Sequence, residues 1–128
     1  MASLRIGGDA LDPDEITAAL GCEPSRHAKK GEVFDKSRAR SKTGTWQLDA
    51  ENRSPGDVDA QVRELLGLIH FDQWDKVIDR YEVDIFCGLF MAGSDEGFSI
   101  SDEVSAMLGE RKIRLEVCLY GPSQRRTE

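Results

Sequence analysis

The residues best suited to chemistry lie in one basic segment, residues 25–48. Its cations could bind a phosphate or another anionic group, and Gly31 would let a backbone approach such a ligand closely. The candidate binding residues of this segment are Arg26, Lys29, Lys30, Arg38, Arg40 and Trp46. The alternative stays open that Trp46 is buried beside a sheet, in the short strand pattern Thr45–Leu48, and that the basic residues form a solvated loop.

Charge is distributed unevenly along the chain. Residues 25–42 hold seven Lys or Arg against two acidic residues, a net charge of +5, while the whole chain carries −7 and the remainder therefore −12. This asymmetry could steer an anionic partner or pair the basic segment with its own acidic body. The overall acidity argues against a general nucleic-acid binder, and the segment lacks the aromatic residues, interleaved with basic ones, that a stacking platform requires.

Other catalytic and metal chemistries have little support in the sequence. Cys22, Cys87 and Cys118 are the only cysteines, and no two lie closer than 31 residues, so we predict no zinc site and no cofactor. Gly7-Gly8 lacks the further residues of a phosphate-binding loop, and no nucleophile elbow is present. We therefore expect no enzyme, with the alternative of a small enzyme whose site assembles around the 25–48 segment from distant residues.

Residues 12–24 specify one short helix. Asp12 can cap the free N–H groups, Pro13 suits the first helical position, and Gly21 supplies a left-handed exit. Pro24 prevents the helix from resuming. Acidic residues of the first turn favour the helix dipole and need no catalytic role.

Hydrophobic periodicity predicts the remaining elements. Strands are expected at 3–6, 43–48, 83–91 and 113–120, and helices at 13–20, 58–69, 74–81 and 101–109, with a break or kink near His70-Phe71 and a cap at Ser101. The alternation in 83–91 and 113–120 predicts two central strands. Four side chains should face the helices: Ile85, Leu89, Leu115 and Val117.

This order of elements predicts an α+β fold. We expect a two-layer sandwich, with a mixed or antiparallel sheet of four to five strands and helices on one face, ferredoxin-like with additions. Residues 1–121 should form a single domain and residues 122–128 a disordered polar tail. No apolar run spans a bilayer, no signal peptide is evident and no disulfide framework is present, so a cytoplasmic protein is expected.

Several phrases, taken in order, resemble a bacterial family known as domain of unknown function 4279. They are Ser3-Leu4-Arg5-Ile6, Leu11-Asp12-Pro13-Asp14-Glu15-Ile16-Thr17, Leu20-Gly21, Pro24, Lys30-Gly31-Glu32, Gly44-Thr45-Trp46-Gln47-Leu48, Gly97-Phe98-Ser99-Ile100-Ser101 and Leu119-Tyr120. The resemblance extends from about residue 3 to residue 120. It implies the single-domain fold and brings no established activity with it.

The expected function is that of a non-enzymatic interaction domain. Such a domain would bind a protein or an anionic ligand through the 25–48 segment or through an exposed sheet face, and a regulatory or immunity-like role would suit a small acidic protein. A nucleic-acid-binding accessory domain is the second alternative, beside the small enzyme. No membrane partner is expected.

Overall fold

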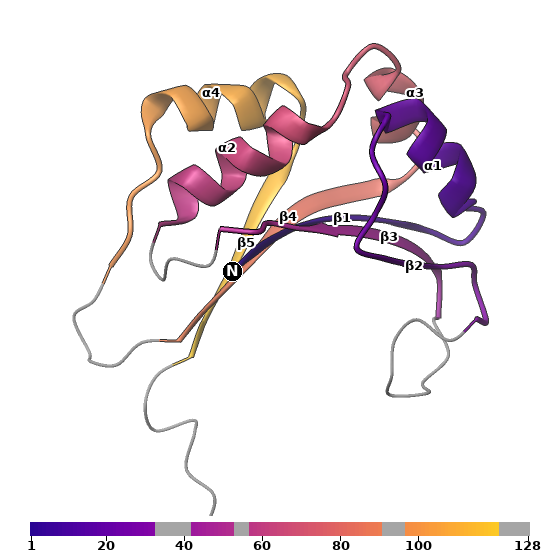
Figure 1. Ribbon diagram of the computed structural model, residues 1–128, viewed down its shortest axis with the longest axis horizontal. Coiled ribbons are helices and arrows are strands. Elements are labelled where there is room, and N and C mark those ends of the chain that lie inside the picture. The colour runs from indigo at the N-terminus through magenta and orange to yellow at the C-terminus, as the bar shows by residue number, and fades with distance from the viewer. Residues whose placement is uncertain (33–41, 53–56, 91–96, 121–128) are drawn as a thin grey trace, which may run out of the picture.

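A computed structural model describes residues 1–32, 42–52, 57–90 and 97–120. In this part of the chain the elements follow the order β1 (Ala2–Gly8), α1 (Pro13–Leu20), β2 (Arg26–Ala28), β3 (Gly44–Asp49), α2 (Val58–Leu68), α3 (Trp74–Ile78), β4 (Glu82–Phe90), α4 (Asp102–Glu110) and β5 (Arg114–Tyr120). Figure 1 shows all these helices on one side of a single sheet. The predicted α+β class, the mixed sheet and the helices on one face are confirmed.

The strand order is β2-β3-β1-β4-β5. β4 and β5 are parallel and joined through α4, whereas the other neighbouring pairs are antiparallel. In a ferredoxin-like sheet, the strands of each strand–helix–strand unit are separated by another strand; here β4 and β5 are direct neighbours. The prediction that 113–120 is a central strand is wrong, because alternation reports a buried face and not the number of neighbouring strands.

The core lies between the sheet and the helices. Leu4 and Ile6 of β1, Trp46 of β3 and Ile85 of β4 are buried there. The other three side chains predicted to face the helices, Leu89, Leu115 and Val117, pack against this core and are half-buried. Leu115 and Val117 are partly exposed because β5 lies at the edge of the described sheet.

Local signals placed the first helix correctly. The Asp12 carboxylate accepts a hydrogen bond from the Asp14 N–H at 3.1 Å, and Pro13 is the first helical residue. Gly21 has φ +67° and donates its N–H to the Thr17 carbonyl at 2.9 Å. Because this left-handed backbone conformation strains most residues that have a Cβ, it favours glycine at the exit of α1.

The predicted break near His70-Phe71 separates two helices, α2 and α3. The predicted irregular segment after residue 24 contains a strand that we did not expect, β2, because three residues are too few to show a period. The predicted tail, residues 122–128, lies outside the described residues. Within those residues, no helix combines the length and apolar character needed to cross a membrane.

Candidate functional site: the open face of the sheet

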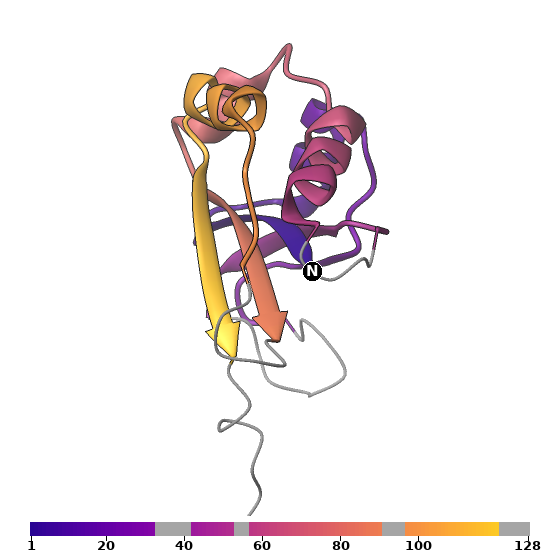
Figure 2. The same ribbon diagram turned by 90° about the vertical axis from the view of Figure 1, so that its left-hand side faces the viewer.

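The sheet has one face turned away from the helices, here called the open face (Figures 1 and 2). Polar and aromatic residues occupy alternating strand positions on this face. Residues directly opposite each other on neighbouring strands share a face. The register therefore places on this face Ser3, Arg5, Gln47, Asp49, Asp84, Phe86, Phe90, Arg114, Glu116 and Tyr120. None of the described helices covers it.

Asp84 is the centre of a charged cluster on the open face. Arg5 donates to both of its carboxylate oxygens, from Nε to Oδ1 at 2.8 Å and from a terminal nitrogen to Oδ2 at 2.6 Å. A terminal nitrogen of Arg114 lies 3.7 Å from the same Oδ2, and Arg114 Nε lies 3.4 Å from a Glu116 oxygen. The Asp84 hydrogen bond raises the pKa of the Arg5 guanidinium. Asp84 is only 7% exposed, so its negative charge needs compensation, and Arg5 and Arg114 provide it.

Asp49 forms a second polar cluster on β3. Its Oδ1 accepts hydrogen bonds from the Ser3 hydroxyl at 2.7 Å and from the Gln47 amide at 2.9 Å. A terminal nitrogen of Arg26 lies 3.7 Å from Asp49 Oδ2. The donors around both carboxylates are side chains of the sheet strands, including Arg26 of β2. Both clusters therefore help to hold the strands together.

An aromatic row, defined as Phe86, Phe90 and Tyr120, runs along β4 and β5. Phe90 is 67% exposed, and its ring stacks on Tyr120 with centroids 4.8 Å apart and planes inclined by 20°. The Arg5 guanidinium lies 4.5 Å from the centroid of Phe86. Gly88 separates these rings: a Cβ there would lie 3.5 Å from Phe86 and 3.7 Å from Tyr120. The row is therefore nearly continuous, and its apolar surface faces solvent at Phe90.

An open depression of about 370 Å³ lies beside the charged cluster. Gly7 of β1, which pairs with Thr45 of β3 and Glu82 of β4, is among its lining residues. Its polar lining combines Arg5, Arg114 and two threonines with the carboxylates of Glu82 and Asp84. This mixed lining favours neither an anion nor a cation.

A family model described as Domain of unknown function (DUF4279) matches residues 1–122. The chain belongs to this family. Neither curated proteins nor solved structures give a match. The family description gives no activity. The residues of this DUF4279 chain are therefore the basis for a proposed function.

Three basic candidates of the DUF4279 chain, Arg26, Lys29 and Lys30, lie in the described residues. Arg26 of β2 lies near Asp49, as described above, and the Lys30 ammonium lies 3.4 Å from an Asp9 carboxylate oxygen. The Lys29 N–H donates to Glu32 at 2.7 Å. Arg38 and Arg40 lie outside the described residues. The described part of the segment thus pairs at two points with acidic residues of the body.

Trp46, the remaining candidate, is 0% exposed. Its indole N–H donates to the Thr17 hydroxyl of α1 at 3.1 Å. The structure therefore places this side chain in the core, as the strand pattern around it suggested. A ligand at the surface of the described structure would not contact the ring.

Catalytic and metal-binding groups are sparse in the described residues. No group of three or more His, Cys, Asp or Glu side chains among them could hold a metal ion. Burial raises the pKa of the Cys22 and Cys87 thiols, so neither has the low thiol pKa of an activated cysteine nucleophile.

The open face includes functional candidates that the initial selection of basic residues missed. Phe86, Phe90 and Tyr120 stand at alternate positions of two strands, so their shared face follows from the pattern. Arg5 and Asp84 are 79 residues apart in the sequence. The residues around each of them do not predict that the two side chains pair.

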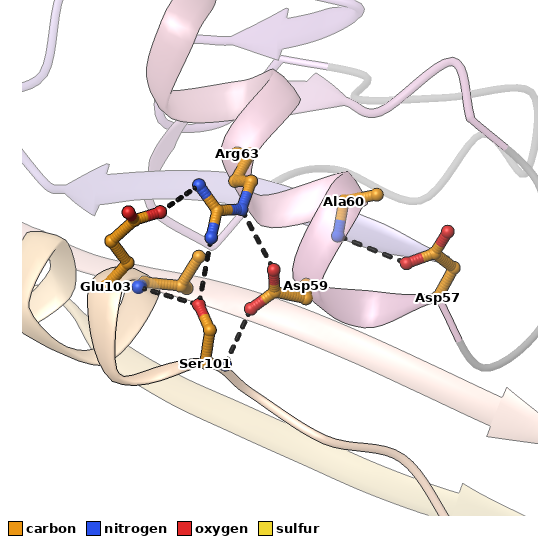
Figure 3. Close-up of polar contacts among 7 residues, drawn as sticks. Asp57, Asp59, Ala60, Arg63, Ser101 and Glu103 are labelled. Atoms are coloured by element: carbon orange, nitrogen blue, oxygen red, sulfur yellow. Dashed lines mark hydrogen bonds and ion pairs between the residues drawn. The ribbon is translucent and has the colours of Figure 1, made fainter.

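A further polar network joins α2 to the start of α4 (Figure 3). Asp59 accepts hydrogen bonds from the Ser101 N–H at 2.7 Å and from Arg63 Nε at 2.9 Å. Arg63 also donates to the Ser101 hydroxyl at 3.0 Å and lies 2.6 Å from Glu103. Ser101 caps α4 by accepting from the Val104 N–H, which confirms the predicted cap. The network fixes one helix against the other.

We expect this network to contribute stability that depends on pH. The hydrogen bonds from Ser101 and Arg63 lower the pKa of Asp59 in the folded chain. A carboxylate of this kind stabilises the fold above its unfolded pKa of about 3.9, and the contribution is lost as pH falls through the lower folded pKa. Asp59→Ala should lower the free energy of unfolding by about 1 kcal/mol at neutral pH, and the deficit should shrink toward pH 3. Urea unfolding of both proteins across this range measures the difference; a constant deficit would contradict the prediction.

Proposed function

We propose that this DUF4279 chain is a non-enzymatic interaction domain that binds a protein partner through the aromatic row. The observation that carries the proposal is Phe90, a residue that is two-thirds exposed while its ring stacks on Tyr120. An aromatic ring that is already ordered loses little conformational freedom on binding, and aromatic anchors contribute much of the energy of protein interfaces. Burial of the row by a partner would remove apolar surface from water.

The charges around the row support a protein partner over a nucleic acid. Arg5 lies over the Phe86 ring and Arg114 stands on the same face, and basic residues beside aromatic rings are typical of a surface that stacks single-stranded bases. Each guanidinium, however, lies within ion-pair distance of a carboxylate of the same face. Nucleic-acid affinity depends on cations that neutralise phosphates, and the net charge of the chain is −7. Alternating charges of both signs suit the polar rim of a protein interface.

The polar clusters support a binding role over catalysis. Asp84 and Asp49 each accept the two hydrogen bonds described above, and the donors are side chains of the same sheet. A general base requires a lone pair that can reach the substrate. These two carboxylates instead accept hydrogen bonds from side chains of the sheet. Their contacts hold the strands together beneath the aromatic row.

Site-specific photo-cross-linking tests the proposal. A photoreactive amino acid at position 90, in cells that make the protein, should give a defined protein adduct identifiable by mass spectrometry. Position 68 provides the matched control, because Leu68 is 45% exposed and belongs to α2 on the other side of the sheet. Tyr120→Ser should reduce the adduct at position 90 roughly tenfold, as expected for the loss of about 1.4 kcal/mol at an interface anchor.

Two results would contradict the proposal. Identical adducts from positions 68 and 90 would show that the row has no selective partner. Tight, salt-dependent binding of a single-stranded RNA by the purified protein, lost in Phe90→Ser, would instead assign the row to nucleic acid.

A further inference from the structure

β5 is a seven-residue edge strand of the described sheet. It pairs with β4 at each of its seven residues, Arg114 to Tyr120, with no interruption of the register. On its other side, no strand in the described part of the chain pairs with it, and Figure 2 shows it as the outermost strand. The opposite edge strand, β2, has only three residues. A regular edge of this length presents unpaired N–H and C=O groups that can template another strand.

The side chains of β5 are complementary to a second, antiparallel copy of the same strand. Directly opposite residues must share a face, and the register with full overlap has its two-fold axis at Val117. In this register Arg114 lies opposite Tyr120 of the second copy, which suits a cation–π contact. Leu115 lies opposite Leu119, which is 51% exposed in the isolated chain. Glu116 lies opposite Cys118, so no like charges face each other.

Neighbouring registers fit less well. A shift of the axis to residue 116 places two Glu116 carboxylates opposite each other, and like charges at such positions are destabilising. A shift to residue 118 leaves Arg114 and Leu115 without partners inside β5. We infer that the chain forms a symmetric dimer in which the two β5 strands pair antiparallel about Val117, giving one continuous sheet. This inference does not depend on the partner proposed for the aromatic row.

The oligomeric state of the purified full chain tests the inference. Edge pairing buries a small area, so we expect a dimer that dissociates in the micromolar range in sedimentation velocity experiments. Leu119→Glu would place a carboxylate opposite Leu115 of the second copy and should raise the dissociation constant at least about tenfold. Leu68→Glu is the matched control, because Leu68 is an exposed leucine of α2 and should leave the dimer unchanged.

A cysteine cross-link tests the register and does not rely on disruption. Opposite residues of an antiparallel pair have Cα atoms about 4.5–5.5 Å apart, within the range of a disulfide. Val117→Cys should therefore give a dimer linked through position 117 under mild oxidation. The natural Cys118 residues would be about 8 Å apart in this register, too far to form a disulfide without movement.

Each outcome bears on the inference. A concentration-dependent dimer that Leu119→Glu weakens and Val117→Cys links would support it. A monomer at every concentration would overturn it, as would a dimer linked only through Cys118. Because these experiments use the purified chain alone, their failure is distinct from failure of the aromatic row to find a partner.

Discussion

Trp46→Ala is expected to lower the free energy of unfolding by about 3–5 kcal/mol. The indole is fully buried between β3 and the helices, and it is the largest fully buried side chain among the described residues. Its removal would leave a cavity and also leave the Thr17 hydroxyl without the indole donor. Chemical denaturation of the variant and the unaltered protein measures the loss.

Two further variants separate the contributions at this site. Trp46→Phe keeps much of the apolar volume and removes the indole N–H, so its loss should be smaller than that of Trp46→Ala. Thr17→Val removes only the hydroxyl acceptor, at an expected cost of about 1–3 kcal/mol. A loss under about 1 kcal/mol in Trp46→Ala would contradict burial in solution and return Trp46 to the group of ligand-facing candidates.

Gln61→Ala is expected to cost about 2–4 kcal/mol. Gln61 of α2 is 1% exposed, and its Oε1 accepts a hydrogen bond of 2.7 Å from the Ala2 N–H at the start of β1. The substitution removes buried volume and the acceptor of a buried backbone donor. Denaturant unfolding measures the sum of these two effects.

Gln61→Leu isolates the polar part of this effect. Leucine has a similar volume but offers no acceptor to Ala2, so we expect a loss of about 1–3 kcal/mol, smaller than that of the alanine variant. If both variants unfold with the stability of the unaltered protein, the contact between α2 and the first strand does not stabilise the fold.

Local chemistry determined much of the secondary structure from the sequence alone. The helix α1 has its own start and stop signals in Asp12, Pro13 and Gly21, and these act through atoms within a few residues of each other. The alternation in β4 likewise identified its buried and open faces before any partner strand was known. The basic segment, in contrast, was predicted as a binding site from its composition. Composition does not determine where charged side chains lie or which groups they pair with.

Tertiary structure decided which distant residues meet and which strands are neighbours. Asp84 is stabilised by Arg5, which is 79 residues away, and Gln61 is buried because it meets the first strand. The parallel pairing of β5 with β4 and its position at the sheet edge follow from the path of the chain through α4. Local periodicity sets which face of a strand is apolar, but long-range backbone pairing sets which strands are neighbours. The sequence by itself therefore determined the family, the α+β class and the capped helix, while only the tertiary structure placed the aromatic row on the open face and β5 at the edge of the described sheet.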